Sequence, residues 1–469
     1  MTKILIVGAG LAGCEAAYYL AKKNYSIVLV EGKKIKPTPA QSLEYFAELV
    51  CTNSLKSIKQ TSAHGLLKYD MEQFGSLVLQ VGNQEGIRVP AGDSLAVDRM
   101  LFSKKIQEVL QSTEKIQIVE ELVSNPLEFA QKHSCTHIIL ATGPLTHGGL
   151  DQWIQENICT QNLYFYDSIA PIVDADSLNY EKLYFKDRHL EVDEKIKADY
   201  LNAPFTKEEY LKFVEELAKA EFIPPKNFEK EIFFENCLPV DVMAKRGKDT
   251  LRYSCMKPIG LENPIDNKRP YAVVQLRKEN LLGDAFNLVG FQSRLTYADQ
   301  KRIFCMIPGL ENAEFFHYGS VHRNTFIHAK EVLDWDFSSK KFPTIYFAGQ
   351  IVGVEGYTES AMCGLYVAYM LDKKLNSLSS LKTIDKWPLE IATGALVNHI
   401  MTAQRPSPTS INFGIMPTPE FIPKGVDKKL FKKEFIVHQA KEAWKNFSSL
   451  QNRIDLNLNG VCTYDSATI

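Results

Sequence analysis

Residues 3–32 read KILIVGAGLAGCEAAYYLAKKNYSIVLVEG, and this stretch decides the fold. An apolar run, Ile4–Val7, precedes a glycine-rich turn and a segment of helical periodicity that extends to Leu20. A second apolar run, Ile27–Val30, ends at the acidic residue Glu31. Strand, glycine-rich turn, helix and strand in this order are typical of a βαβ unit in a doubly wound α/β fold.

The turn carries the spacing G-x-G-x-x-G at Gly8, Gly10 and Gly13. The first glycine permits the tight turn, the second lets a pyrophosphate approach the helix N-terminus, and the third lets helix and strand pack closely. Glu31 stands at the spacing at which an acidic residue accepts a hydrogen bond from a ribose hydroxyl. We therefore expect these four residues to bind a dinucleotide. A glycine-rich turn that binds nothing is the alternative.

Two later apolar runs indicate further strands of the same sheet. They read HIILATG over 137–143 and TIYFAGQ over 344–350. Both resemble the strand-to-turn motifs that border the cofactor in two-dinucleotide-binding flavoproteins, which favours FAD over NAD as the resident ligand. The residues expected at the cofactor from these runs are Ala141, Thr142, Gly143, Gly349 and Gln350.

The distance between these motifs predicts a discontinuous FAD-binding domain, because some 340 residues separate the first from the last. We expect its first part at 1–164, an inserted domain at 165–335, and its second part, with a basic C-terminal helix, at 336–469. The predicted fold class is α/β, a Rossmann-like FAD-binding domain that carries an inserted α+β domain. Within the insert, Thr206 and Glu209 form a capping-box pattern at the start of a helix.

Length and composition are those of an ordinary folded enzyme of more than one domain. The chain has 469 residues, of which 45% are hydrophobic and 23% charged, and its net charge is −2. This balance excludes a global positive field for nucleic acid. The nine cysteines are scattered without a C-x-x-C pair, so no zinc site or disulfide framework is predicted. No bilayer-spanning run or signal peptide is evident, and we expect a cytoplasmic protein without a membrane partner.

Longer segments along the whole chain resemble one family, the folate- and FAD-dependent tRNA uracil-5-methyltransferases (TrmFO). The segments are GAGLAGCEAA (8–17), TPAQSLEYFAELVCTNSLKS (38–57), GDSLAVDR (92–99), YLNAPFTKEEY (200–210), FENCLPVDVMAKRG (234–247), MKPIGLENP (256–264), RPYAVVQLR (269–277), QKRIFCMIPGLENAEFFHYG (300–319), HRNTF (322–326), FAGQIVGVEGYTES (347–360) and INFGIMP (411–417).

The resemblance implies methylation of carbon 5 of a uridine in structured RNA. It further implies that methylenetetrahydrofolate supplies the carbon, that FAD relays it and completes the methyl group, and that NAD(P)H is the reductant. Three motifs depart from the family pattern, at Ser254-Cys255, at 297–300 and at 360–365. These departures leave two targets open, a tRNA uridine or, as in the related ribosomal branch (RlmFO), a uridine of 23S rRNA.

Two cysteines in the matching motifs are the predicted catalytic residues. Carbon 5 of uracil is a poor nucleophile until a group adds to carbon 6, and a thiolate suits that addition. Cys51 in LVCTNS and Cys237 in FENCLP both stand at polar loop boundaries. We favour Cys237 as the nucleophile and Cys51 as the proton-handling partner, although the sequence alone allows the reverse. The other seven cysteines are interpreted as structural.

The remaining site predictions concern the flavin and the RNA. Gly356 and Tyr357 are expected in a turn and helix N-terminus under the flavin ring, where Tyr357 either stacks on the ring or is an ordinary core residue. Lys245 and Arg246, close to Cys237 in the chain, are expected to contact RNA phosphates. A row of lysines in residues 424–445 is either an RNA-facing patch or a solvated helix face. No protein partner or metal is implied.

Two other functions are compatible with the glycine fingerprint. One is an FAD-dependent oxidoreductase or folate reductase, which would keep Gly8, Gly10 and Gly13 but would not need the two cysteines. The other is a non-catalytic RNA-binding protein that retains a flavin site. Replacing each cysteine by alanine separates the three, because only the methyltransferase loses methylation while it keeps the flavin.

Overall fold

The computed structural model describes residues 2–159, 163–188, 198–223, 238–376, 386–404 and 406–458. Buried side chains in these ranges form two main hydrophobic cores. The larger core comes from both ends of the chain, and the smaller comes from residues 173–313. No helix in the described ranges is both long and apolar enough to cross a membrane.

A five-stranded parallel sheet lies at the centre of the larger core, in the order β16-β7-β1-β2-β6. Its strands are β1 (Lys3–Val7), β2 (Ser26–Val30), β6 (Ile116–Val119), β7 (His137–Leu140) and β16 (Ile345–Phe347). The continuous apolar runs suit strands that are covered on both faces. Both predicted distal strands are therefore confirmed, since β7 pairs with β1 and β16 with β7.

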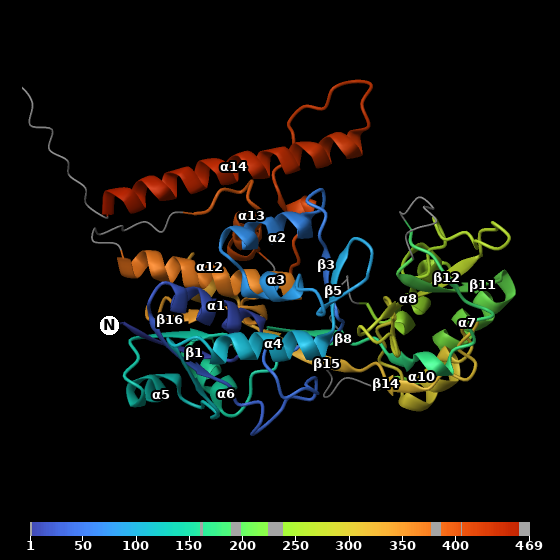
Figure 1. The fold of residues 1–469 in the computed structure, drawn as a ribbon, viewed down its shortest axis with the longest axis horizontal. Helices are drawn as coiled ribbons and strands as arrows, with labels where there is room; N and C mark the ends of the chain where they lie inside the picture. Colours follow the sequence, from blue (N-terminus) through green and yellow to red (C-terminus); the bar gives the residue numbers. More distant parts are fainter. Residues whose placement is uncertain are drawn as a thin grey trace, which may run out of the picture.

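Helices cover both faces of this sheet. Figure 1 shows α1 and α12 on one side and α5 and α6 on the other. These helices and their companions are α1 (Leu11–Lys22), α2 (Ala63–Gln73), α3 (Leu77–Gly82), α4 (Arg99–Gln111), α5 (Pro126–Lys132), α6 (Leu150–Asn157), α11 (Ala329–Val332), α12 (Tyr357–Asn376) and α13 (Ala392–Thr402). Helices α1 and α12 pack closely because Gly364 has no side chain; a Cβ there would lie 2.1 Å from the Ala12 carbonyl oxygen.

A small antiparallel sheet is inserted between α1 and α4 in the chain. It has the order β3-β5-β4. Its strands are β3 (Ser54–Ser57), β4 (Arg88–Val89) and β5 (Ser94–Val97). The loop before β3 carries Cys51, so this sheet determines where that thiol lies relative to the parallel sheet.

The smaller core belongs to a six-stranded antiparallel sheet in the order β10-β11-β12-β13-β9-β14. Its strands and helices are β9 (Ile172–Asp174), β10 (Tyr184–Phe185), β11 (Tyr200–Phe205), β12 (Ala272–Lys278), β13 (Ala285–Leu288), β14 (Phe315–His317), α7 (Lys207–Lys219), α8 (Val240–Arg246), α9 (Thr250–Tyr253) and α10 (Tyr297–Phe304). Strand β8 (Leu163–Ser168) precedes this unit in the chain and β15 (Val321–Phe326) follows it, and the two strands pair as an antiparallel ribbon. Figure 1 shows the unit to one side of the parallel sheet.

The helix predicted after residue 206 is present as α7. Thr206 and Glu209 form the expected capping box, in which the Thr206 hydroxyl accepts from the Glu209 backbone N–H. The helix ends at Lys219. Its buried side chains, including Tyr210 and Phe213, face the antiparallel sheet.

The C-terminal helix α14 (Lys428–Leu458) lies across the top of the molecule in Figure 1. A cluster of aromatic rings fixes it to the larger core. The Trp444 ring lies 5.6 Å from that of Phe74 and 5.9 Å from that of Trp387. Ile436 and Ala440, about two turns and one turn before Trp444, are also buried.

Candidate functional site

A cavity of about 230 Å³ opens where the parallel strands end. Its walls come from the ends of β1, β2, β7 and β16 and from the start of α1. The strand order reverses at β1, with β2 on one side and β7 on the other. Ligands of open α/β sheets bind at such a switch point. All the strand-end residues that the sequence predicted at the cofactor line this cavity: Gly8, Gly10, Glu31, Ala141, Thr142, Gly143, Gly349 and Gln350.

The three fingerprint glycines have separate steric roles. Gly8 adopts φ +101°, and a Cβ there would lie 2.5 Å from the Ala141 carbonyl oxygen. A Cβ on Gly13 would lie 1.9 Å from the Gly8 carbonyl oxygen, so Gly13 is required by packing. A Cβ on Gly10 would meet nothing within 4 Å, because Gly10 faces the cavity. Gly10 alone of the three thus leaves room for a ligand.

Glu31 stabilises the glycine turn from the end of β2. Its Oε2 accepts from the Ala9 backbone N–H at 2.7 Å and its Oε1 from the Lys33 backbone N–H at 2.9 Å. The Lys33 ammonium in turn forms a buried ion pair with Glu48 at 2.8 Å. Each carboxylate oxygen of Glu31 can accept a second hydrogen bond. A bond from a ribose hydroxyl therefore stays a prediction that the geometry permits.

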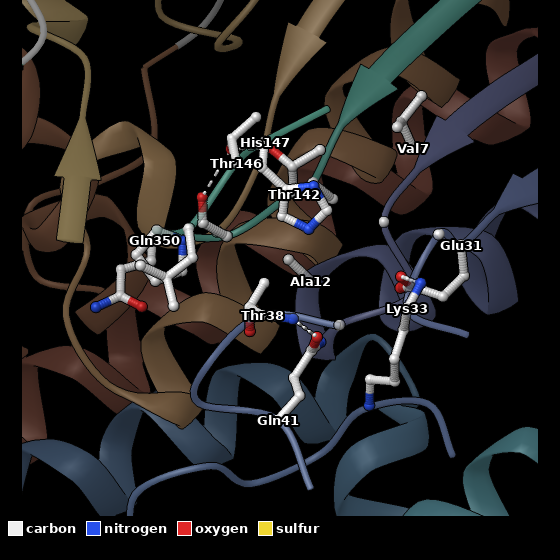
Figure 2. Close-up of a pocket in the computed structure, with 18 of the residues that line it drawn as sticks. Val7, Ala12, Glu31, Lys33, Thr38, Gln41, Thr142, Thr146, His147 and Gln350 are labelled. Carbon is white, nitrogen blue, oxygen red and sulfur yellow. Dashed lines mark hydrogen bonds between the residues drawn. The ribbon is translucent and has the colours of Figure 1, made fainter. Parts of the chain in front are cut away.

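The cavity has the features that a dinucleotide needs. No side chain caps the N-terminus of α1, so its first N–H groups are free to meet an anion. Within the described residues the buried His147 Nδ1, on the cavity wall, has no hydrogen-bond partner. Figure 2 shows Glu31 and Lys33 at one end of the cavity and Gln350 at the other, with His147 between them. The residues thus fit an elongated ligand with a pyrophosphate at Gly10.

A second cavity of about 210 Å³ adjoins the first. The two share seven wall residues, which are Ala40, Val50, Pro144, Leu145, Gln350, Tyr357 and Ser360. Cys51 and Lys56 line only the second cavity, as does Gln292 from the antiparallel unit. A ligand in the first cavity and a substrate in the second would therefore meet at the shared wall, beside residues 49–53, which we call the Cys51 loop.

Tyr357, the first residue of α12, holds the Cys51 loop from the side of the first cavity. Its phenolic oxygen accepts from the backbone N–H of Cys51 at 2.5 Å and of Thr52 at 3.1 Å. Burial raises the pKa of the Tyr357 phenol well above its usual value, and the nearby Cys51 thiol adds to this rise. The phenol is therefore neutral at ordinary pH and positions the loop through its oxygen.

The antiparallel unit holds the same loop from the opposite side. Asn53 is fully buried, and its Nδ2 donates to the carbonyl oxygens of Lys278 and Glu279 at 3.0 and 3.1 Å. The Arg277 Nε donates to Asn53 Oδ1 at 2.9 Å. These contacts join positions more than 220 residues apart in the chain. They make the position of the loop depend on the docking of the antiparallel unit.

Arg99, at the start of α4, links the loop to the same junction. Its Nη1 donates to the Leu49 carbonyl oxygen at 3.1 Å, and its Nε lies 2.5 Å from Glu279 Oε1. Burial raises the pKa of Glu279, while the Arg99 and Arg277 charges act against that rise. The two arginines therefore compensate a buried carboxylate and fix the ends of the loop.

In the wall of the second cavity, Gly356 packs against the buried carboxylate of Glu359. Gly356 adopts φ +118°, and a Cβ there would lie 2.4 Å from Glu359 Oε2. Glu359 is fully buried, and burial acts to raise its pKa, but the hydrogen bond and charge of His64, the charge of Lys56 and a backbone hydrogen bond together lower it. Burial lowers the pKa of neighbouring Lys68 to about 8. A glycine is thus required at position 356 by its backbone conformation and by the packing of Glu359, whether or not a ligand is bound.

The structure does not bring Lys245 and Arg246 to the walls of these two cavities. Lys245 and Arg246 end α8 in the antiparallel unit, and both are exposed. Lys245 Nζ lies 4.4 Å above the Phe222 ring. Cys237 lies outside the described residues. The cysteines interpreted as structural are buried or half-buried where they are described, namely Cys14, Cys135, Cys159, Cys255, Cys305 and Cys363.

Sequence reasoning missed the residues that hold the loop. Asn53, Arg99 and Arg277 occur in the matched segments 38–57, 92–99 and 269–277, but the sequence assigns them no role. Glu279 carried no signal at all. The arginines in the matched motifs were the available signal, but their partners lie too far away in the chain to be inferred without the fold.

Comparisons with known proteins agree with this geometry. The family model described as "Glucose inhibited division protein A" matches residues 3–379. The chain is 44% identical over 434 residues to "Methylenetetrahydrofolate--tRNA-(uracil-5-)-methyltransferase TrmFO" of Natranaerobius thermophilus, covering 92% of this chain and 96% of that protein. It is 43% identical over 453 residues to the protein of the same name from Sulfurihydrogenibium, covering 95% and 99%.

Among solved structures, Aquifex aeolicus GidA in two crystal forms has the same fold. Form II has a TM-score of 0.64 at 13% identity, with 97% of this chain and 76% of that chain covered. Form I has a TM-score of 0.65 at 14% identity, with 94% and 75% covered. At such low identity the likeness shows the fold alone.

Proposed function

This chain belongs to the TrmFO family, within the wider glucose-inhibited division protein A family, and on that premise we propose that it methylates carbon 5 of a tRNA uridine. The methyl carbon comes from methylenetetrahydrofolate. The observation that carries the proposal is the pair of joined cavities, one shaped for a dinucleotide and one that presents the Cys51 loop at their shared wall.

FAD is the cofactor proposed for the first cavity. Gly10 leaves the space for its pyrophosphate, and the uncapped start of α1 supplies N–H donors. Glu31 accepts from the ribose, and Gln350 and Tyr357 lie where the first cavity meets the second. When bound and reduced, FAD supplies the relay of the one-carbon unit and the hydride. NAD(P)H is the proposed source of those electrons.

The second cavity receives the uracil, which must leave its stack to reach it. A thiolate adds to carbon 6, the sulfur–carbon bond forms, and the electron pair moves onto carbon 5, which then attacks the one-carbon unit. Loss of the carbon-5 proton to a base then lets the one-carbon unit part from its carrier, and hydride addition to the methylene left on carbon 5 forms the methyl group and expels the thiolate. We assign the addition to Cys237 and the proton to Cys51, whose loop Tyr357 and Asn53 hold at the cavity wall.

Transfer RNA is the proposed target because the two relatives compared above are named for it. The departures at 254–255, 297–300 and 360–365 do not argue against this target. Cys255 packs against the core of the antiparallel unit, where burial raises the pKa of its thiol to about 12 and makes the thiol inert. Lys245 and Arg246 remain proposed contacts to the RNA phosphates.

Covalent trapping tests this mechanism. A tRNA that carries 5-fluorouridine lacks the proton that must leave carbon 5, so the enzyme should stay bound to the base. Cys237→Ala should abolish the adduct, and Cys51→Ala should keep it while losing methylation. Cys305→Ala, which changes a half-buried thiol with no proposed role, is the matched control and should keep both. All variants should retain the flavin spectrum.

The outcomes also separate the alternatives. Trapping lost in Cys51→Ala and kept in Cys237→Ala would reverse the two roles. Trapping kept in both would remove these thiols from carbon 6. An oxidoreductase or folate reductase would oxidise NAD(P)H without transferring labelled carbon from methylenetetrahydrofolate to RNA, and a non-catalytic RNA-binding protein would do neither.

A further inference from the structure

Four lysines stand in the first two turns of α14: Lys428, Lys429, Lys432 and Lys433. We call them the α14 lysine cluster. Within the described part of the chain, none of them has a carboxylate in ion-pair distance, whereas Lys445 further along the helix pairs with Glu442 at 2.6 Å. The cluster therefore brings four positive charges together without an ion pair among the described residues, with Asp427 as the neighbouring carboxylate on which the Lys429 charge acts.

Local helix stability does not explain the cluster. The positive end of a helix dipole lies at its N-terminus, where lysines are unfavourable. The first N–H groups are already capped by Asp427, whose Oδ1 accepts from Lys429 at 2.8 Å and Leu430 at 3.0 Å. Burial of apolar surface does not explain it either, because Leu430 beside the cluster is 54% exposed. An external anion would stabilise this group of charges.

The cluster stands where α14 extends beyond its aromatic anchor. Each residue of an α-helix turns the chain by about 100°, so Lys429 and Lys433 fall on the side of the helix that Ile436, Ala440 and Trp444 bury further along. Lys428 and Lys432 lie to one side of that row. Lys428, Lys429 and Lys432 are exposed and Lys433 is half-buried. The side of the helix that is apolar at the core is therefore basic where the helix extends beyond it.

The basic end of the helix also lies on the side of the second cavity. Ser410 lines that cavity, and the chain runs from it to the start of α14 at Lys428. In Figure 1 the start of α14 lies toward β3, which also contributes to the cavity wall, and the other end lies toward the N-terminus of the chain. Exposed Phe421, in the intervening loop, offers a ring for stacking.

We propose that the α14 lysine cluster contacts the phosphate backbone of the RNA whose uridine enters the second cavity. The proposal rests on the proposed function for the identity of the RNA. With a net charge of −2, the protein needs local cations to hold a polyanion. A phosphate backbone matches four closely spaced ammonium groups, and a basic row beside the cavity would hold the RNA while one base is turned out.

The test replaces all four lysines by glutamine, which removes the charges but keeps helix propensity. The matched control replaces Lys22, Lys23, Lys104 and Lys115, on α1, on α4 and before β6, and changes the net charge equally. Binding of unmodified tRNA is measured by fluorescence anisotropy from low to high salt. Flavin content and the methylation rate at saturating tRNA are measured beside it.

We expect the Kd of the cluster variant for tRNA to rise at least roughly 10-fold at low salt, and its salt slope to fall by up to about four ions. The control should keep the wild-type Kd, and both should keep flavin and the saturated rate. A Kd equal to that of the control would overturn the proposal. Binding of both variants to anionic vesicles is measured as well, and the proposal would also be overturned if the cluster variant lost vesicle binding but bound tRNA as the wild-type protein does. Failure of the proposed function is distinct, because the wild-type protein would then methylate no tRNA.

Discussion

Replacing Asn53 by alanine should release the loop that carries Cys51. The Asn53 side chain is fully buried and makes three hydrogen bonds, two to carbonyl oxygens and one from the Arg277 guanidinium. A neutral bond contributes about 1 kcal/mol and one from a charged group about 1.5–3 kcal/mol. The variant should therefore lose about 4 kcal/mol of interactions at the junction of the loop with the antiparallel unit.

The assay is the rate of Cys51 alkylation by iodoacetamide, read residue by residue by mass spectrometry. If all 4 kcal/mol opposed opening, the rate would rise roughly 1,000-fold, since each 1.4 kcal/mol is a factor of ten. Tyr357 still holds Cys51 and Thr52, and Arg99 still holds Leu49. We therefore expect a rise on the order of 10–100-fold.

Asn202 offers a matched control. It is equally buried, and its side chain makes four hydrogen bonds, to three backbone carbonyls and from Gln275, wholly within the antiparallel unit. Asn202→Ala should lower the free energy of unfolding by a similar amount and leave Cys51 alkylation unchanged. Equal alkylation rates in the two variants would refute the idea that Asn53 positions the loop.

Two further predictions concern flavin binding and pH. Gly10→Val should fold normally but lose the flavin spectrum, because the valine side chain enters the cavity. Gly13→Ala should fold poorly, because its Cβ would collide with the Gly8 carbonyl oxygen. If folded Gly10→Val retained its flavin, the cofactor assignment would be wrong. Burial raises the pKa of Asp70 from 3.8 to about 7, so the native state keeps a proton that the unfolded chain releases, and stability should fall as pH rises from about 4 to 7. Asp70→Asn, which can still accept hydrogen bonds from Thr393, should remove up to roughly 4 kcal/mol of that loss. The free energy of unfolding is measured by denaturant titration at pH 4 and pH 8; the same difference between the two pH values in the wild-type protein and in Asp70→Asn would contradict this.

The sequence sufficed for the features that depend on local pattern. The βαβ unit follows from apolar runs on either side of a glycine turn, and the start of α7 follows from two residues three apart. The strands after residues 137 and 344 were also predictable, because short apolar runs that end in small residues are rare outside such sheets. In each case the residues that determine the structure are neighbours in the chain.

The parts that could not be predicted depend on distant partners. The sequence predicts Tyr357 either at the flavin ring or in the core, and its bond to the Cys51 loop, 306 residues away, has no signature in either segment. Asn53 and Arg277 are 224 residues apart and come together only when two separate sheets dock. The position of the α14 lysines likewise depends on the aromatic anchor at Trp444, whose ring packs against Phe74 and Trp387 from two other segments of the chain.

The strand order of the parallel sheet has a consequence for synthesis on the ribosome. Strand β7 ends at Leu140, but its outer neighbour β16 begins only at Ile345, roughly 200 residues later. At about 5–20 residues per second, an apolar strand edge waits on the order of 10–40 s for its partner. The antiparallel unit is completed within that interval. The nascent chain thus relies on early folding of that unit, or on a chaperone at the open edge, to avoid pairing with other chains.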